Sequence, residues 1–478
     1  MIDSDRMAAV DRNAESLGVP RKQLMESSGN AVAREVRDTA DPGASVAVVA
    51  GRGNNGGDAF VAARFLDDYA LTVHLLGRPE SIGSTISREN WDALQECDYD
   101  TEVVTDSRAL DLGSPDVVVD ALLGTGVSGA PREPEASAIE AVNATDAAVV
   151  AVDVPSGMDA DTGEAPGVAV DADRVVTFHD LKPGLADRED VTVADIGIPD
   201  AAELFVGPGD LLGLERDPQA HKGDFGRVLV VGGGPYAGAP ALSAQAALRA
   251  GADLAHLAVP DRVAGSVQGY SENLIVDGLV GTRLVPEHVP ELLERASGAD
   301  VVVLGPGLGD ADSTLDAVAD FLADFDGRAV VDADALQVVP DVDTDAALVC
   351  TPHQGELQQM GGPEAEDWEE RADAVEEFAA DLGHTLLVKG AYDVVSDGET
   401  TRVNRTGNPG MTVGGTGDVL AGATAAMLST LAPVPAASVG AYANGAAGDI
   451  VVEDHGYGLL ATDLVDALPD ALWGDQDE

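Results

Sequence analysis

The sequence predicts an α/β protein of two three-layer domains, each a mostly parallel sheet with helices on both faces. Three observations lead to this prediction. The chain has 478 residues, more than one ordinary domain needs. Short, continuous apolar runs alternate with helical stretches in both halves, as in strands that are buried on both faces of a parallel sheet. Between Val206 and Gln219 the sequence turns rich in Gly, Pro and charge. We therefore place the domains at residues 1–210 and 218–478.

The first half opens with a helical pattern from about Asp5 to Arg37. Its strands are predicted at Ser45–Ala50, Leu71–Leu76, Val117–Ala121, Ala147–Val152 and Arg174–Phe178. In the second half they are predicted at Arg227–Val231, Leu254–Val259, Val301–Leu304, Ala329–Asp332, Ala347–Cys350 and Thr385–Val388. A helical tail follows from about Asp418. The halves share no repeated motif, so we expect two unlike domains rather than a duplication.

Charge is the most extreme compositional property. The 85 Asp and Glu residues face 27 Lys and Arg residues, which gives a net charge of −58. The acid is spread along the chain, as on a solvated surface, and such a surface repels nucleic acids and anionic membranes. We expect neither as a partner. Molar salt screens the self-repulsion, so the composition favours an organism that accumulates salt, such as a haloarchaeon.

The sequence predicts a cytoplasmic enzyme. Cys97 and Cys350 lack the CxxC spacing of a redox or metal site, and a reducing compartment fits them. The N-terminal MIDSDRMAAVDRN has neither the basic start nor the apolar stretch of a signal peptide. No run of about 18 apolar residues is long enough to span a membrane. A homo-oligomer is compatible with the sequence, which does not specify one.

A glycine-rich loop follows the first strand, GRGNNGGDAFVAARFL at residues 51–66. Gly51, Gly53 and Gly56 match the GxGxxG of dinucleotide-binding folds, which also place an acid after the next strand to hold a ribose. That strand is followed here by Gly77 and Arg78, which disfavours a hydride-transferring dehydrogenase. The loop N–H groups at the helix start can instead hold a pyrophosphate. The alternative is an Asx-rich helix cap.

Three more polar loops follow later strands of the first half. Asp120 ends one strand and precedes the flexible GTG of residues 124–126, while VDVPSG contains Asp153 and Ser156. Lys182, one of only four lysines, follows another strand. One Asp at a strand end is usually a cap. Because the carboxyl ends of parallel strands meet at one edge of the sheet, several such loops together indicate a site.

These segments resemble the YjeF-type N-terminal domain, the NAD(P)H-hydrate epimerase, over about residues 5–205. NNGGD, DALLGTG and VDVPSG, in that order, make the resemblance specific. It implies a Rossmann-like fold in which Asp153 is the catalytic acid, and Asn55, Asp120 and Ser156 ligate a potassium ion. The substrate would be held by Asn54, Asn55, Gly56, Gly57, Asp58, Gly124, Thr125, Gly126, Val127, Ser128, Gly129 and Ala130. Two departures are Ala59, where the family usually has Gly, and ESSG in place of ENAG.

The strongest motif of the second half is GNPGMTVGGTGDVLAG at residues 407–422. The backbone N–H groups of Gly414, Gly415, Thr416 and Gly417 would form an anion hole for a transferring phosphoryl group. Asp418, at the start of the next helix, would accept a hydroxyl proton as general base. A plain helix N-cap would explain Asp418 but not the small residues before it.

GTGD before a helix is typical of ribokinase-like folds. With HKGDFG, GPGLG, TPHQGE and KGAYD, the segment resembles the NAD(P)H-hydrate dehydratases over about residues 218–470. The resemblance implies that the hydrated nucleotide contacts Ala239, Gly307, His353 and Asp418. ADP, with Mg²⁺ on its phosphates, would be bound by Lys389, Gly390, Ala391, Tyr392 and Asp393 together with Gly414, Gly415, Thr416 and Gly417. Asn444 stands where the family often has His, and an ordinary loop histidine is the alternative for His353.

Together the resemblances imply an enzyme that is both an isomerase and a lyase. It would interconvert the (R) and (S) epimers of NADHX and NADPHX, the hydrated forms of NADH and NADPH. It would then dehydrate the (S) epimer with ADP, releasing AMP and phosphate. One alternative is a ribokinase-like kinase of a small alcohol or vitamin precursor, which shares the Asp418 chemistry. The other is a non-catalytic binding module, such as a scaffold in RNA processing. The charge of −58 opposes a role with RNA, and the intact NNGGD, Asp120 and Asp153 oppose a loss of catalysis.

Overall fold

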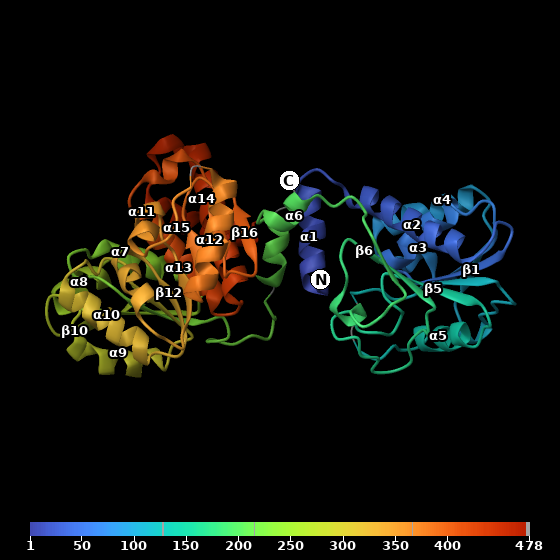
Figure 1. The fold of residues 1–478 in the computed structure, drawn as a ribbon. Helices are drawn as coiled ribbons and strands as arrows, with labels where there is room; N and C mark the ends of the chain where they lie inside the picture. The colour runs from blue at the N-terminus through green and yellow to red at the C-terminus, as the bar shows by residue number, and fades with distance from the viewer. Residues whose placement is uncertain (127–128, 215, 366, 475–478) are drawn as a thin grey trace. The chain divides into compact units, whose positions relative to one another are not determined.

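The computed structural model describes residues 1–126, 129–214, 216–365 and 367–474. The chain forms two compact units, Met1–Ala202 and Glu203–Glu478, and each is built on one sheet (Figure 1). In the described part of the chain, no helix is both long and apolar enough to cross a bilayer.

The sheet of the first unit has seven parallel strands in the order β3-β2-β1-β4-β5-β6-β7. They are β1 (Ser45–Ala50), β2 (Ala70–Leu76), β3 (Thr101–Val104), β4 (Val117–Ala121), β5 (Ala148–Val152), β6 (Arg174–Phe178) and β7 (Val191–Ala194). The central strands are runs of Val and Ala that are buried on both faces, as the parallel arrangement requires. All seven strands therefore end at the same edge of the sheet.

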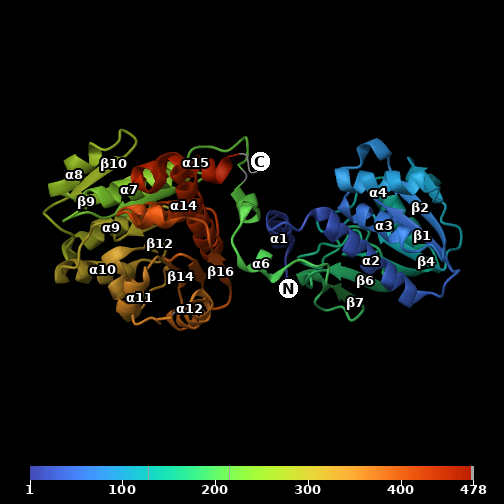
Figure 2. The ribbon, with the colours of Figure 1, turned by 90° about the horizontal axis from the view of Figure 1, so that it is seen from above.

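Helices cover both faces of this sheet. One face packs against α1 (Ser4–Ser16), α2 (Arg21–Thr39), α3 (Asn54–Arg64) and α4 (Thr85–Glu96), and the other against α5 (Glu135–Asn143). Figures 1 and 2 show α2 and α3 side by side over the strands. The predicted opening helix is two helices, because Gly18, at φ +90°, and Pro20 interrupt it. This break turns α1 toward the edge where the strands end.

The sheet of the second unit has nine strands in the order β10-β9-β8-β11-β12-β13-β14-β15-β16. They are β8 (Arg227–Val231), β9 (Leu254–Pro260), β10 (Ile275–Leu279), β11 (Val301–Leu304), β12 (Arg328–Val331), β13 (Ala347–Cys350), β14 (Thr385–Val388), β15 (Asp393–Ser396) and β16 (Thr401–Asn404). The strands from β8 to β14 are all parallel, whereas β15 and β16 add an antiparallel hairpin at one edge.

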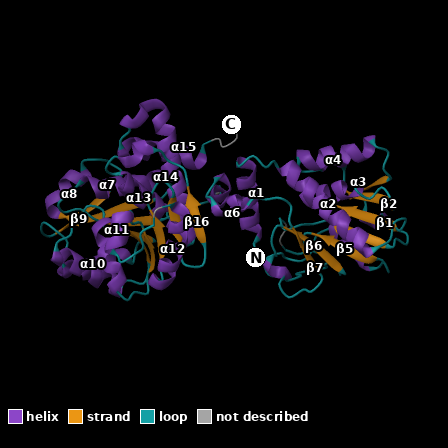
Figure 3. Ribbon diagram, turned by 45° about the horizontal axis from the view of Figure 1, so that its top comes forward, coloured by secondary structure: helices purple, strands orange, loops and turns teal. Residues whose placement is uncertain are grey.

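Two hydrophobic cores flank this second sheet. Figure 3 shows the strands of the sheet as the middle layer of the unit. One core contains α7 (Gly238–Arg249), α8 (Asp261–Gln268), α13 (Thr416–Leu428), α14 (Pro433–His455) and α15 (Ala461–Trp473). The other contains α9 (Val289–Ala296), α10 (Asp312–Asp324), α11 (Gln354–Gln359) and α12 (Trp368–Leu382). Helices α7 and α13 pack so closely that a Cβ on Gly422 would lie 2.0 Å from the carbonyl oxygen of Ser243.

The two units divide between Ala202 and Glu203, before the Gly- and Pro-rich segment of residues 206–219 and within α6 (Asp200–Leu204). Residues just after the division are held by β16. Phe205 forms a β-bridge with Val403, and Arg402 forms an ion pair of 2.9 Å with Asp210. The end of the predicted first domain, residues 203–210, thus belongs to the second unit, because an edge strand pairs with it. Composition alone does not reveal that pairing.

Candidate active sites

The first unit has a cavity of about 1060 Å³ at the edge where β1, β4, β5 and β6 end. This is where open parallel sheets bind ligands. Residues from all four strand ends line it, together with the starts of α1, α3 and α4. Among the predicted residues, the lining includes Asn54, Asn55, Asp58, Gly124, Thr125, Gly126 and Asp153.

The glycine loop is shaped by close approaches of the backbone. A Cβ on Gly51 would lie 2.0 Å from the carbonyl oxygen of Leu122, and one on Gly56 would lie 2.2 Å from that of Gly51. Helix α3 begins at Asn54, and its N-cap is Gly53, which makes no side-chain hydrogen bond. The Asx-cap alternative is therefore wrong, and the first N–H groups of α3 remain available to an anion.

Asn55 and Ser156 meet at the carbonyl group of Leu123, and Ser156 also contacts Asp120. The Asn55 amide donates to that carbonyl at 2.9 Å, and the Ser156 hydroxyl lies 3.2 Å from it. The Asp120 carboxylate accepts from the Ser156 hydroxyl at 2.6 Å and from the Ser156 N–H at 2.8 Å. Burial raises the pKa of Asp120 to about 6, against the lowering effect of these hydrogen bonds. The buried carboxylate of Asp120 thus lies beside the Ser156 hydroxyl, which in turn lies beside the Leu123 carbonyl oxygen.

Asp153 faces the cavity beside a buried lysine. Its backbone has φ +66°, a left-handed conformation that Asp tolerates better than most residues. The Lys182 ammonium, fully buried, lies 3.5 Å from the Asp153 carboxylate and donates to the carbonyl oxygens of Phe178 and Asp180. The Thr177 hydroxyl donates to the same carboxylate at 3.1 Å.

Two more carboxylates share this cavity. Burial raises the pKa of Asp58 well above its usual range, and Asp153 and Asp11 raise it further. Asp11, on α1, has its pKa raised to about 6, chiefly by burial, against the lowering effect of Arg21. Asp11 was not predicted as a site residue, because nothing in the helical pattern shows that α1 reaches the strand ends.

Other predicted substrate residues lie farther from the cavity. Gly56 and Gly57 are buried in α3, whereas Gly129 and Ala130 are exposed and are not among the residues that line the cavity. Val127 and Ser128 lie outside the described residues.

In the second unit, α13 begins directly after the predicted anion loop. Its N-cap is Gly415, at φ +103° and without a side-chain hydrogen bond, so Asp418 is not the N-cap but lies in the first turn. The Thr416 hydroxyl donates to the carbonyl of Met411 at 2.9 Å. The Asp449 carboxylate accepts from Gly407 N at 2.9 Å, which pins the loop to α14. Because the N-cap is a glycine, it offers no side chain to the first N–H groups of α13.

Burial raises the pKa of Asp418 to about 7, and the carboxylate of Asp332 adds to the rise while Lys389 opposes it. A carboxyl group with a pKa near neutrality suits a general base at the pH of the cell. The Ser243 hydroxyl lies 2.8 Å from the Asp418 carbonyl and 3.3 Å from that of Ala239, which joins α7 to the start of α13.

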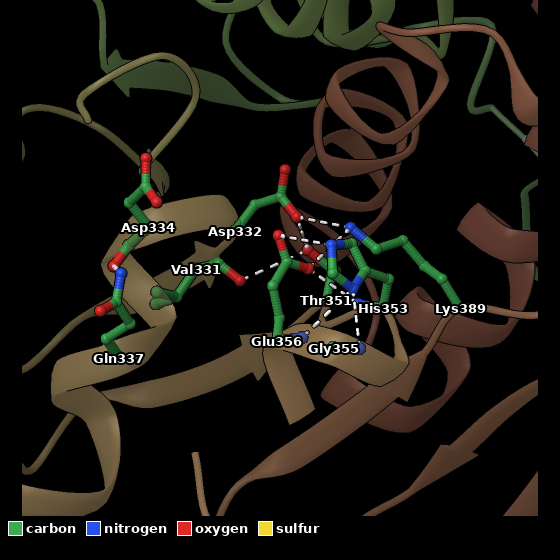
Figure 4. Close-up of polar contacts among 9 residues, drawn as sticks. All are labelled: Val331, Asp332, Asp334, Gln337, Thr351, His353, Gly355, Glu356 and Lys389. Atoms are coloured by element: carbon green, nitrogen blue, oxygen red, sulfur yellow. Dashed lines mark hydrogen bonds and ion pairs between the residues drawn. The ribbon is translucent and has the colours of Figure 1, made fainter. Parts of the chain in front are cut away.

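Lys389 lies at the centre of a charged cluster (Figure 4). Its ammonium is 3.0 Å from the Asp332 carboxylate and 3.5 Å from that of Glu356, and the Thr351 hydroxyl donates to Asp332 at 2.8 Å. Burial lowers the pKa of Lys389, but the two carboxylates outweigh it and the net shift is upward. A Cβ on Gly417 would lie 3.4 Å from the Lys389 ammonium. The cation therefore stands next to the anion loop.

His353 is the N-cap of α11. Its Nδ1 accepts from the N–H groups of Gly355 at 2.9 Å and Glu356 at 3.2 Å, so the ring proton lies on Nε2. The side chain is 60% exposed, which leaves the ring open to a ligand. His353 and Glu356 form a capping box, but with His in place of the usual Ser or Thr the TPHQGE segment does not show the pattern by which Glu356 could have been predicted.

The KGAYD segment forms the turn between β14 and β15. The Asp393 carboxylate accepts from Gly390 N at 2.9 Å and from the Asn404 amide at 3.0 Å, and the Tyr392 ring stacks on Trp368 at 5.2 Å. These two side chains shape the turn, while Ala391 is exposed. Asp393 therefore holds the loop in place from within.

Gly307 lies beside Ala239. Its φ is +73°, and an added Cβ would lie 3.3 Å from the Cβ of Ala239 and 2.8 Å from the carbonyl oxygen of Tyr236. Gly307, from the loop after β11, thus lies beside Ala239 in the first turn of α7, and Ser243 of the same helix contacts the Asp418 carbonyl in the first turn of α13. Asp332, Glu356 and Ser243 were not predicted as site residues, although Asp332 is the last residue of a predicted strand.

Comparison with known proteins matches both units to one family. The profile described as YjeF-related protein N-terminus matches residues 21–184, and that described as NAD(P)H-hydrate dehydratase matches residues 228–470. Two archaeal proteins named bifunctional NAD(P)H-hydrate repair enzyme are similar over 98% of this chain. The one from Methanothermobacter thermautotrophicus is 44% identical over 94% of its length, and that from Pyrobaculum aerophilum 45% identical over 97%.

Among solved structures, an ADP/ATP-dependent NAD(P)H-hydrate dehydratase from Bacillus subtilis, co-crystallised with ATP and Mg²⁺, is 28% identical. The similarity covers 54% of this chain and 92% of that one, with a TM-score of 0.47. The matches to the archaeal relatives, at 44% and 45% identity, cover 98% of this chain and so span both units. The chain therefore belongs to the family of bifunctional NAD(P)H-hydrate repair enzymes.

Proposed function

We propose that this chain interconverts the (R) and (S) epimers of NADHX and NADPHX in its first unit, and dehydrates the (S) epimer in its second. The observation that carries the proposal is Asp418, a carboxyl group with a pKa of about 7 at the edge of a glycine anion loop. The free thiols of Cys97 and Cys350 support a reducing cytoplasm. The charge of −58 supports a halophilic host.

In the dehydratase unit, Asp418 takes the proton of the C6 hydroxyl group. The oxygen then attacks the terminal phosphorus of ADP, and AMP leaves. The N–H groups of the glycine loop and the Lys389 ammonium stabilise the charge on the transferring phosphoryl group. Phosphate then departs from C6 as a proton leaves the neighbouring carbon, which restores the double bond of NAD(P)H.

The second unit offers two carboxylates for a magnesium ion. Asp332 and Glu356 both point to Lys389 beside the anion loop, and carboxylate oxygens suit Mg²⁺ when phosphates supply further ligands. When bound, the ion would neutralise charge on the phosphates. Asp332 and Glu356 would hold it, while Thr351 fixes the orientation of Asp332 through its hydroxyl.

In the epimerase unit, Asp153 would exchange a proton with the C6 hydroxyl group of the bound hydrate, a role that its position in the cavity lining supports. Lys182 and Thr177 hold its carboxylate at the cavity wall. Asp11 and Asp58, with their raised pKa values, offer protons in the same cavity. The start of α3 would hold the pyrophosphate.

The cluster of Asn55, Asp120 and Ser156 fits a potassium ion. Its oxygens are hard ligands, and a cation would compensate the buried Asp120 carboxylate, whose pKa burial raises to about 6. Bound there, K⁺ would supply charge and fix the loop of Leu123. The residues of that loop would then be held for the substrate.

Removal of potassium is expected to slow the epimerase and spare the dehydratase. An uncompensated buried carboxylate costs on the order of 1–3 kcal/mol, so exchange of KCl for choline chloride at equal ionic strength should slow epimerisation about tenfold or more. Dehydration of pure (S)-NADHX with ADP and Mg²⁺ is the control, and should be unchanged. Equal rates of epimerisation in both salts would contradict the potassium assignment.

The function itself is tested with a mixture of both NADHX epimers in concentrated KCl. We expect full recovery of reduced-nicotinamide absorbance with ADP or ATP and Mg²⁺, release of phosphate, and no recovery without nucleotide. Recovery that stops at the content of one epimer would refute the epimerase assignment alone. A stable phosphorylated product without NADH would support the kinase of a small alcohol instead.

A further inference from the structure

The cavity of the first unit is lined mainly by acids, although the substrate proposed for it is an anion. A dinucleotide carries negative charge on its pyrophosphate, which therefore needs a cation in this cavity. Among the described residues, the cationic side chains of the lining are those of Arg21, Arg52 and Lys182. The carboxylates of the lining are those of Asp5, Asp11, Glu15, Asp58, Glu135, Asp153, Asp159 and Asp161.

We propose that Arg52 binds the pyrophosphate of the hydrated dinucleotide, and that its guanidinium exchanges Glu135 for the phosphate when the substrate enters. This inference rests on the proposed epimerase function and names a further residue that binds its substrate. Arg52 acts on binding alone, because the proton exchange at C6 belongs to Asp153.

Arg52 stands in the glycine loop, two residues before the start of α3 at Asn54. The backbone is fixed on both sides of it. The N–H of Gly51 donates to the carbonyl of Ala121 at 2.9 Å, and the N–H of Gly83 donates to the carbonyl of Arg52 at 2.9 Å. A pyrophosphate held by the first N–H groups of α3 therefore lies beside the backbone that carries the Arg52 side chain.

Gly77, which follows β2, makes room for the stem of the Arg52 side chain. A Cβ added to Gly77 would lie 2.7 Å from the Arg52 Cδ and 3.1 Å from its Nε. The stem thus fills the space that a side chain at position 77 would need. From there the guanidinium reaches Glu135, the first residue of α5, which also lines the cavity.

The ion pair of Arg52 is weak enough for a phosphate to replace it. The guanidinium lies 3.2 Å from the Glu135 carboxylate, and the Arg52 side chain is 41% exposed. Ion pairs of such exposure contribute little, whereas a guanidinium can bind phosphate oxygens through two parallel hydrogen bonds. The other cations of the lining are less suited to this role. Arg21 belongs to α2 rather than to the glycine loop, and Lys182 is fully buried beside the catalytic acid.

The test measures epimerisation alone, in the full chain without ADP or ATP, so that dehydration does not consume the hydrates. Rates with purified epimers of NADHX and NADPHX are followed by chromatography at the lowest KCl concentration that keeps the chain folded. Arg52→Gln is expected to raise the KM for both hydrates about tenfold, the loss of one charged hydrogen-bond contact, with kcat unchanged. A rise confined to NADPHX would overturn the assignment to the pyrophosphate in favour of the 2′-phosphate.

Glu135→Gln separates binding from a structural role of the ion pair. Glu135 competes with the phosphate for the guanidinium, so its neutralisation is expected to lower the KM for both hydrates about threefold, the opposite direction to Arg52→Gln. If the ion pair served only to hold the loop, both variants would lose it and both would raise the KM. That result would contradict the inference.

The matched control is Arg108→Gln, which removes the same charge from an 83% exposed side chain of the same unit that does not line the cavity. It should leave both KM values unchanged. If Arg52→Gln also leaves them unchanged while both hydrates are epimerised, the inference is wrong and the proposed function stands. If the unaltered chain epimerises neither hydrate, the epimerase function fails and the inference fails with it.

Discussion

Replacement of Asp418 by Asn is expected to lower the dehydratase rate by about 10²- to 10⁴-fold, the usual contribution of a general base. The amide has the shape of the carboxyl group but cannot accept the hydroxyl proton. Asp418 lies in the first turn of α13 without capping it, so the helix should remain intact. The measurement is ADP-dependent recovery of NADH from pure (S)-NADHX.

The pH profile gives this prediction a second readout. The pKa of Asp418 is about 7, and only the ionised form accepts a proton, so the rate of the unaltered chain should fall as pH decreases through about 7. The control is Asp312→Asn, which removes a first-turn carboxylate from the exposed start of α10. Loss of activity in this control as well would show that charge alone, not the base, is responsible.

The raised pKa of Asp418 also predicts a change in the stability of the fold. Because the folded chain keeps this proton up to about pH 7 while the unfolded chain releases it near 3.8, ionisation destabilises the fold as pH rises between these values. Asp418→Asn should therefore raise the urea midpoint at pH 8 relative to the unaltered chain and leave it unchanged at low pH. Equal midpoints at pH 8 would contradict the raised pKa.

The sequence was sufficient to predict the central strands and not the edge strands. Runs such as SVAVVA at Ser45–Ala50 are buried on both faces, so their composition alone identifies them. The missed strands include β3 (TEVV) and β10 (IVDGL), which are half-exposed at sheet edges, and the hairpin of β15 and β16. Their polar and glycine residues resemble loops, because an edge strand needs only one apolar face.

Loops that follow strands were predictable as parts of a site, but contacts between distant segments were not. The sequence places Asp120 at the end of one strand and Asn55 and Ser156 after two others, and the contacts that Ser156 makes with Asp120 and that Asn55 and Ser156 make with Leu123 follow from strand order. Asp332 and Lys389 are separated by two strands in the chain, and only the fold reveals their contact of 3.0 Å. Asp11 reaches its site only because α1 turns away from α2.

Replacement of Asp153 by Asn is the second change with a large expected effect. We expect epimerisation to slow by about 10²- to 10⁴-fold, since the proton-exchanging carboxylate is lost while the cavity keeps its shape. Asn is the right substitution because it tolerates the φ of +66° at this position, whereas Ala would add backbone strain to the loss of chemistry. In the mixed-epimer assay, recovery should stop near the initial content of (S)-NADHX, apart from slow spontaneous epimerisation.

Asp98→Asn is the matched control for Asp153→Asn. Asp98 also has a left-handed backbone, at φ +58°, but it is exposed at the end of α4 and does not line the cavity. The Asp98→Asn chain should epimerise the hydrates at the normal rate. A defect in the Asp153→Asn chain could then not be ascribed to lost charge or to asparagine at positive φ. Because Asp153 and Asp418 lie in separate compact units, each variant should keep the activity that the other loses. An Asp153→Asn chain that still recovers both epimers at the normal rate would remove Asp153 from the mechanism and leave Asp11 and Asp58 as the acids to examine next.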